Sequence, residues 1–193
     1  AQTLTTNSTS HCIERGVQQI LHGRWFDESK DKAYSFSEDY SKMIVDKGLF
    51  VDSTISKHLL EYESELKGEK QRPSNPNVSS EPTFESIINI FRHLDSVGVK
   101  IIGALDMGMS KADFNKAVAS AWAHVEWLGF DHWKAIRSIT FTNAEAMRIE
   151  NRKGLISEDY DADLVFYKKD PTKNIRNLVY DPQHVIKGGE IIF

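Results

Sequence analysis

Short apolar runs alternate with segments of helical period along most of this chain. Runs rich in apolar or β-branched residues predict strands at residues 2–5, 17–22, 49–51 and 99–105. Segments of helical pattern lie between them at residues 42–47 and 84–97. A short helix is also expected between the first two strands, where Asn7, Ser8 or Thr9 could cap its start and Gly16 its end. Three further helices are expected, over residues 111–127, over residues 131–139 and from Asn143 onward. This alternation predicts a parallel α/β sheet or barrel.

The C-terminal part changes to a β pattern. Residues 162–167 and 185–193 are strand candidates, and the second of these predicts a hairpin around Gly188 and Gly189. Residues 67–82 hold three of the five prolines among charged, Asn and Ser residues, which predicts a loop. The chain therefore predicts an α/β part followed by a small β element.

The bulk composition predicts a folded, soluble protein that binds neither nucleic acid nor a membrane. Of the 193 residues, 40% are hydrophobic, which is enough for one domain or a large part of one. The 24 basic and 28 acidic residues are interspersed and give a net charge of -4, so no basic face attracts phosphates. No apolar run approaches the roughly 20 residues that span a membrane. A cytoplasmic location is favoured.

Cysteine content limits the kinds of metal site. Cys12 is the only cysteine, which excludes an internal disulfide and a cysteine-based zinc cage. Any metal must therefore be held by His, Asp or Glu. The chain opens on Ala1 without an initiator Met or the features of a signal peptide, so we expect that the natural start lies upstream.

Two residues stand at the carboxyl ends of predicted strands, where parallel α/β folds gather functional side chains. His22 closes residues 17–22, and Asp106 follows residues 99–105. An imidazole there can bind a divalent metal, and a carboxylate can ligate it and take a proton from water. Each residue alone is also typical of a structural role, His22 as a hydrogen-bonding terminus and Asp106 as a turn former. Spacing by itself does not separate these interpretations.

A wider match favours the functional interpretation. Residues 98–108, G-V-K-I-I-G-A-L-D-M-G, resemble the segment G-V-x-I-x-x-G-T-D-x-G of the amidohydrolase superfamily, in its imidazolonepropionase and prolidase-like branch. Residues 16–23, G-V-Q-Q-I-L-H-G, resemble its G-V-D-x-I-E-H-G. The family's A-A-T-x-N-A-A helix, its A-D-L-V and D-P segment and its closing strands have counterparts in residues 138–145, 153–171 and 185–189. These motifs follow the family order over almost the whole chain.

The resemblance implies a (β/α)8 TIM-type barrel flanked by a small β-sandwich. Residues 1–152 would supply about strands five to eight of the barrel, and residues 153–193 the C-terminal strands of the sandwich. In that family, the residue matching His22 ligates a metal at the end of the sixth strand. The residue matching Asp106 contacts the metal at the end of the eighth and works as acid and base. The resemblance thus implies a divalent metal, with zinc expected, held by His22 and Asp106, and Asp106 as the catalytic residue.

The chain also departs from the family pattern. Where the family has a metal-binding His on its fifth strand, residues 3–7 read T-L-T-T-N, and His11 would fall inside the first helix. The first-strand H-x-H pair and the fourth-strand Lys or Glu have no counterparts, and Leu105 replaces an expected Thr. We therefore expect a fragment with an incomplete metal site, inactive alone, which forms a homo-oligomer or is completed by another chain.

The implied function is hydrolysis of an amide-type C–N bond by metal-activated water, in a dipeptide, an acyl amino acid or a cyclic amide. A lactonase or phosphotriesterase on the same scaffold is one alternative, since the superfamily also supports ester chemistry. A metal-free, non-catalytic module that keeps the fold for binding is another. The sequence indicates no substrate-binding residue.

Other polar residues are interpreted as structural. Asp52 and Thr54 are expected to form a polar strand terminus rather than to contact substrate. His124 and His132 lie on or beside predicted helices. Asp163 resembles the family's structural Asp, which fixes the return of the chain into the β-sandwich.

Overall fold

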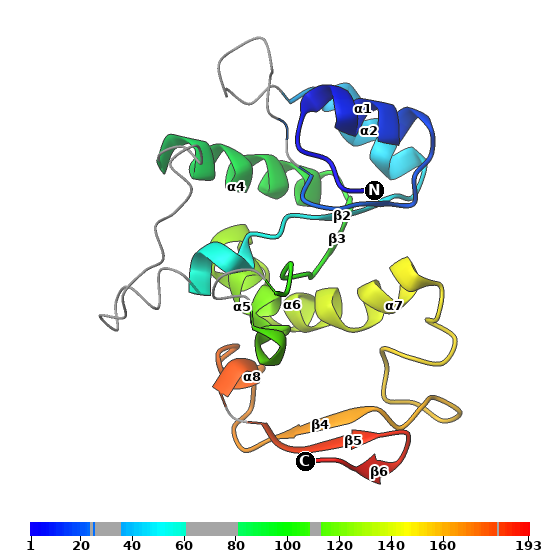
Figure 1. Ribbon diagram of the computed structural model, residues 1–193, viewed down its shortest axis with the longest axis vertical. Coiled ribbons are helices and arrows are strands. Elements are labelled where there is room, and N and C mark those ends of the chain that lie inside the picture. The colour runs from blue at the N-terminus through cyan, green and yellow to red at the C-terminus, as the bar shows by residue number, and fades with distance from the viewer. Residues whose placement is uncertain (24, 26–35, 61–80, 109–112, 181) are drawn as a thin grey trace. The chain divides into compact units, whose positions relative to one another are not determined.

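The computed structural model describes residues 1–23, 25, 36–60, 81–108, 113–180 and 182–193. The chain divides into two compact units, of which residues 1–54 with 58–102 form the first and residues 55–57 with 103–193 the second. Figure 1 labels helices and strands of both units where there is room. The first unit contains a parallel sheet and the second an antiparallel one, so the expected α/β part and terminal β element are both present.

The parallel sheet of the first unit joins segments that are far apart in the sequence. Strands β1 (Gln19–Ile20), β2 (Phe50–Asp52) and β3 (Lys100–Ile102) pair in this order. On the other side of β1, Gln2 forms a parallel bridge with Leu21. All three residues of β2 are buried, as expected of an inner strand in a parallel sheet. The strands predicted at residues 17–22, 49–51 and 99–105 are confirmed with other bounds, whereas the segment predicted at residues 2–5 contributes the Gln2 bridge.

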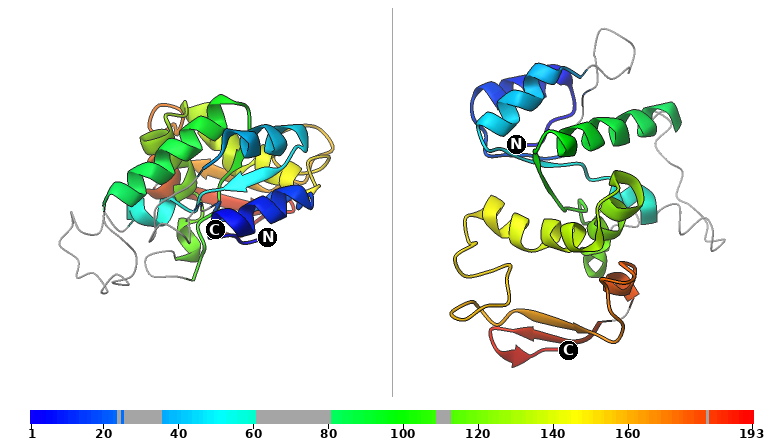
Figure 2. Two further views of the ribbon diagram at one scale, coloured as in Figure 1. Left: turned by 90° about the horizontal axis from the view of Figure 1, so that it is seen from above. Right: turned by 180° about the vertical axis from the view of Figure 1, so that it is seen from behind.

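Three helices join the successive parallel segments and lie on one face of the sheet (Figures 1 and 2). They are α1 (Thr6–Glu14), α2 (Glu38–Asp46) and α4 (Glu81–Ser96). A glycine with positive φ follows each of them: Gly16, Gly48 and Gly98. The next residue donates its N–H to a carbonyl five positions back: Val17 to Cys12, Leu49 to Ile44 and Val99 to Leu94. This recurring helix end directs the backbone into the following strand.

The start of α1 differs from the expectation that Asn7, Ser8 or Thr9 caps it. Thr5 is the cap: its Oγ1 accepts the Ser8 N–H at 3.2 Å, and Ser8 Oγ accepts the Thr5 N–H at 3.1 Å. This reciprocal arrangement satisfies two backbone donors at once, which explains why it prevails over the later candidates.

The start of α4 corrects the expected loop over residues 67–82. The helix begins at Glu81, so Pro82 lies in its first turn, where the fixed φ of proline is compatible with a helix and no intrahelical N–H is required. The rest of that loop prediction, up to residue 80, lies outside the described residues.

The second unit begins with helices packed on one another. The helix expected over residues 111–127 is instead a series of short pieces: η1 (Phe114–Lys116), α5 (Ala119–Ala123) and a π-helical turn, η2 (His124–Leu128). Residues 111 and 112 are not described. The other two expected helices are confirmed as α6 (His132–Ile139) and α7 (Phe141–Met147). Many of the buried side chains on these helices are small, which permits close helix packing. The buried alanines are Ala119, Ala121, Ala123, Ala135, Ala144 and Ala146.

The antiparallel sheet closes the chain. Its strands are β4 (Leu164–Tyr167), β5 (Pro182–Lys187) and β6 (Glu190–Ile191), with the short helix α8 (Asn177–Tyr180) between the first two. The predicted hairpin at Gly188 and Gly189 is confirmed. None of the helices in the described part of the chain has the length and apolar character that crossing a bilayer requires.

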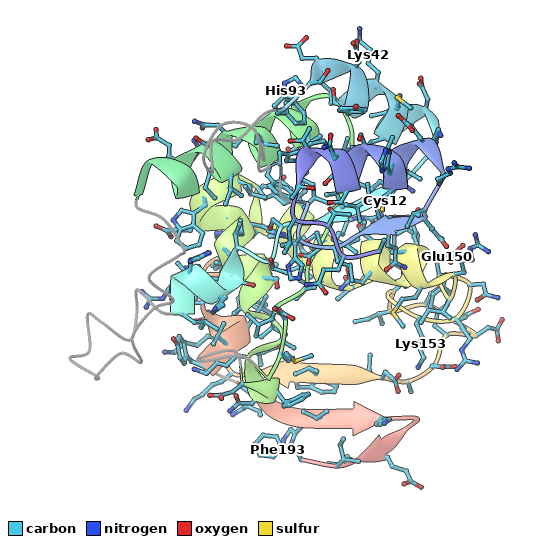
Figure 3. All side chains as sticks on the ribbon, turned by 45° about the horizontal axis from the view of Figure 1, so that its top comes forward. Cys12, Lys42, His93, Glu150, Lys153 and Phe193 are labelled. Atoms are coloured by element: carbon cyan, nitrogen blue, oxygen red, sulfur yellow. The ribbon has the colours of Figure 1, made fainter. Side chains whose placement is uncertain are left out.

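An ion-paired loop braces this sheet. Lys153, labelled in Figure 3, lies between α7 and β4. Its Nζ pairs with Asp161 Oδ2 at 2.8 Å and with the Asp163 carboxylate, which also accepts the Gly188 N–H at 2.9 Å. The hydrogen bond from Lys153 is the main cause that lowers the pKa of Asp163. Asp163 therefore links the loop to the hairpin turn, in agreement with the structural role expected for it.

Candidate active site

His22 lies two residues beyond β1, on the carboxyl side of the strand, and its side chain is half-buried. The imidazole Nδ1 is 2.8 Å from Oγ1 of Thr54. The next residue, Gly23, has φ of 47°, and a Cβ on it would lie 2.9 Å from Cγ1 of Val51. A side chain at Gly23 would therefore collide with β2. The His-Gly pair lets the backbone pass close to β2 while the imidazole stays at the strand end.

Thr54 occupies the corresponding end of β2 and is buried. Its N–H donates to Asp52 Oδ1 at 3.0 Å, and its hydroxyl donates to the Ser53 carbonyl at 2.8 Å. Asp52 is itself buried. The Asp side chain thus stabilises a tight turn that places the Thr54 hydroxyl against His22.

The bond between His22 and Thr54 was not apparent from the sequence, where Thr54 is interpreted as part of a polar strand terminus. The two residues are 32 positions apart. The strand register would have revealed the contact, because Ile20 pairs with Val51 and so brings the residues beyond both strands together. A sequence pattern gives the strands but not this register.

Backbone strain marks the ends of all three parallel strands. Beyond β1, β2 and β3, respectively, His22, Thr54 and Asp106 have φ of 69°, 50° and 59°. This left-handed region costs a non-glycine residue about 1–3 kcal/mol, and for a β-branched residue such as Thr54 it is a clear outlier. Residues held in such conformations cluster at functional sites. Arg148 and Asp159 share this conformation, so the functional interpretation of His22 and Asp106 depends on their place after the parallel strands.

Asp106 belongs to the second unit, and its side chain is exposed. Among the described residues, none forms a hydrogen bond or an ion pair with its carboxylate. Its position is set instead through the backbone that leads to it.

Three side chains hold the two carbonyls at the start of that backbone segment. The Asn143 Nδ2 donates to the Gly103 carbonyl at 2.9 Å. The hydroxyls of Ser56 and Ser120 both donate to the Ala104 carbonyl, at 3.1 and 2.8 Å. We call Ser56, Ser120 and Asn143 the carbonyl clamp. It immobilises the chain two to three residues before Asp106.

A buried histidine contacts Ser138, which holds the N–H of Gly103 in the same backbone segment. The Gly103 N–H donates to the Ser138 carbonyl at 3.0 Å, and Ser138 Oγ lies 2.8 Å from Nδ1 of His124. Burial lowers the pKa of His124 to about 3, so the imidazole is neutral at ordinary pH. His124 is therefore a structural residue, as expected. His132 is also engaged, through a hydrogen bond between its Nδ1 and the Thr172 carbonyl.

The donors present match part of a divalent-metal site. His22 and Asp106 offer an imidazole nitrogen and a carboxylate, both common ligands of such ions. Within the described ranges, no group of three or more His, Cys, Asp or Glu side chains is placed to hold a metal. A zinc site needs at least three protein ligands. Each of the two residues, taken within its own unit, thus offers a ligand type that suits such an ion.

Thr3 lies in the segment, residues 3–7, where the resemblance predicts a further metal-binding histidine. Thr3 follows the Gln2–Leu21 bridge, and its N–H donates to the Leu21 carbonyl at 3.0 Å. Its buried hydroxyl is hydrogen-bonded to that of Thr9 at 2.9 Å. His11 lies exposed on α1. Thr3 is therefore held by a backbone hydrogen bond and a hydroxyl contact.

Comparison with solved structures identifies the fold. The chain is similar to a Xaa-Pro dipeptidase crystallised with methionine in its active site, with 24% identity and a TM-score of 0.76 over 98% of this chain and 43% of that one. It is similar to a prolidase in complex with N-methylphosphonate-L-proline, with 21% identity and a TM-score of 0.73 over 100% and 44% of the two chains. The chain therefore spans less than half the length of these proteins.

An ochratoxinase from A. niger has the same fold, with 19% identity and a TM-score of 0.76 over 99% of this chain and 40% of that one. A comparison with curated proteins found no match. The model of the amidohydrolase family matches residues 3–192. Because that match covers nearly every residue, the chain belongs to the amidohydrolase family.

Proposed function

We propose that this chain supplies His22 and Asp106 to the metal centre of a hydrolase that cleaves an amide-type C–N bond. Members of the amidohydrolase family generally use divalent metal ions. The observation that carries the proposal is the placement of both residues in a left-handed conformation after a parallel strand, with His22 two residues beyond β1 and Asp106 four residues beyond β3. Such strand ends are where α/β enzymes gather their functional groups.

The rest of the barrel is proposed to lie outside this chain. Residues 1–152 would form about strands five to eight, and residues 153–193 the C-terminal strands of a β-sandwich. Two features support this: the chain spans 43% of the dipeptidase, and Phe166, Ile191 and Phe193 are exposed on or beside the antiparallel sheet. Further ligands and strands would come from another part of the protein or from a complementing chain, and a homo-oligomer is a further arrangement to test.

In this proposal His22 is a metal ligand, and Asp106 transfers a proton. A divalent cation, zinc in our proposal, would make water nucleophilic at neutral pH and polarise the carbonyl. His22 would hold it through Nε2. The Asp106 carboxylate would accept a proton from the attacking water and pass it to the leaving nitrogen as the C–O bond forms and the C–N bond breaks. Its exposed side chain is free of competing partners among the described residues, which suits a group that must exchange a proton.

The proposed substrates are a dipeptide, an acyl amino acid or a cyclic amide. A dipeptidase and a prolidase among the structural neighbours support the first of these. The test is hydrolysis of a dipeptide, an N-acyl amino acid, a lactone and a phosphotriester by the complete protein, before and after a chelator. We expect amide hydrolysis that the chelator abolishes and added zinc restores. Preference for the lactone or phosphotriester would replace the proposal by ester chemistry on the same scaffold.

One observation favours a second candidate, a metal-free binding module. In the segment where the resemblance predicts a metal-binding histidine, Thr3 forms a hydroxyl pair with Thr9 of α1. On this alternative, the complete protein would contain no metal and would hydrolyse none of the four substrates.

A further inference from the structure

The hydrogens around His22 can be assigned from the acceptors that Thr54 contacts. A threonine hydroxyl carries one hydrogen and accepts through its lone pairs. A backbone carbonyl only accepts, so the 2.8 Å contact between Thr54 Oγ1 and the Ser53 carbonyl uses that hydrogen. The same Oγ1 lies 2.8 Å from Nδ1 of His22. With its own hydrogen committed, Thr54 must accept there, and Nδ1 of His22 must donate.

The assignment fixes the tautomer of the neutral imidazole. A neutral imidazole carries its hydrogen on one ring nitrogen and a lone pair on the other. A hydrogen on Nδ1 therefore places the lone pair on Nε2, which is the form that can bind a cation through Nε2. Metal-binding histidines generally have their second nitrogen hydrogen-bonded in this way, and that bond sets the ring orientation.

The geometry of Thr54 shows that the arrangement is built into the fold. Its side chain is 7% exposed, and its φ of 50° is unfavourable for a β-branched residue. The bond from its N–H to Asp52 Oδ1, at 3.0 Å, holds the turn in that conformation. An ordinary turn would avoid this strain by using glycine or asparagine.

We propose that Thr54 is a positioning residue that locks His22 in the Nδ1–H tautomer and thereby presents the Nε2 lone pair. The tautomer itself follows from contacts within the first unit. Its use for a cation rests on the proposed function.

The test is a long-range proton–nitrogen correlation spectrum of the metal-free complete protein, labelled with nitrogen-15, at alkaline pH, where imidazoles are neutral. A His22→Gln variant identifies the His22 signals by their loss. We expect the wild-type spectrum to show a protonated Nδ1 and an unprotonated Nε2. The opposite pattern in the wild type overturns the proposal without any substitution at Thr54.

Two substitutions separate the hydroxyl from the strain. Thr54→Val keeps the β-branched shape and the strain but removes the hydroxyl, and we expect the Nε2–H form to appear. Thr54→Ser keeps the hydroxyl, and we expect the wild-type tautomer. Zinc affinity, measured by competition with a chromophoric chelator, should fall about 10- to 100-fold in the Val variant and little in the Ser variant. An unchanged tautomer in Thr54→Val contradicts the proposal.

The two readouts keep the hypotheses distinguishable. The spectrum is recorded without metal and tests the role of Thr54 alone. If the tautomer responds as expected but neither wild type nor Thr54→Ser binds zinc, the metal role of His22 is wrong and the positioning role of Thr54 stands.

Discussion

The strand ends that carry His22 and Asp106 are held in different ways. At the first, the fold fixes the side chain: the imidazole is half-buried and hydrogen-bonded to the strained Thr54. At the second, the fold fixes the backbone through the carbonyl clamp and leaves the carboxylate exposed. A metal ligand needs one fixed direction, whereas a proton carrier must reach both water and a leaving group. The contrast thus matches the two roles that we propose.

The largest expected effect comes from removing the proton carrier. Asp106→Asn keeps the size and tolerates the left-handed φ but cannot accept the proton. We expect the kcat for amide hydrolysis to fall about 10²- to 10⁴-fold, with little change in thermal stability. Asp159→Asn is the matched control, because Asp159 is also exposed and has φ of 65°. Equal activity in the two variants would remove Asp106 from the mechanism.

Buried His124 should make the free energy of unfolding depend on pH in the acid range. The unfolded chain protonates this imidazole near its ordinary pKa of about 6.5, whereas the folded chain resists until about pH 3. His124 therefore contributes fully to stability above pH 6.5, and its contribution is lost as the pH falls toward 3, by up to about 1.4 kcal/mol per pH unit. Urea unfolding between these limits should show a shallower pH dependence for His124→Asn than for the wild type. The same slope in both would contradict the assignment.

The smallest effect is expected at the two serines of the clamp. Ser56 and Ser120 donate to one carbonyl, so either can partly replace the other. Ser56→Ala and Ser120→Ala should each lower the free energy of unfolding by about 0.5–1 kcal/mol. The double variant should lose more than the sum, since it leaves the Ala104 carbonyl without either donor. Additive losses would show that the serines act independently.

The sequence predicts the position of both candidate residues but not what holds them. His22 and Asp106 could be placed because apolar runs and helix-ending glycines are local signals. Thr54 and Asn143 act on partners 32 and 40 positions away, and no local pattern encodes such contacts. The left-handed φ angles could not be predicted either, because residues of the same types adopt other conformations at most positions in proteins.

The region around α5 shows a second limit. A helix over residues 111–127 is expected from its composition, but its described part divides into three pieces. The π-helical turn at His124–Leu128 widens the backbone where His124 is buried against Ser138. Tertiary packing of this kind overrides helix propensity, which differs by only a few tenths of a kcal/mol between most residues.

The most direct measurement is the metal content of the complete protein with and without the His22 imidazole. Elemental analysis should find a bound divalent metal in the wild type, and the His22→Gln variant should lose part or all of it. His11→Gln is the matched control, because His11 lies exposed on α1, and it should retain the wild-type content. Equal metal content in all three proteins, or none in the wild type, would contradict the account.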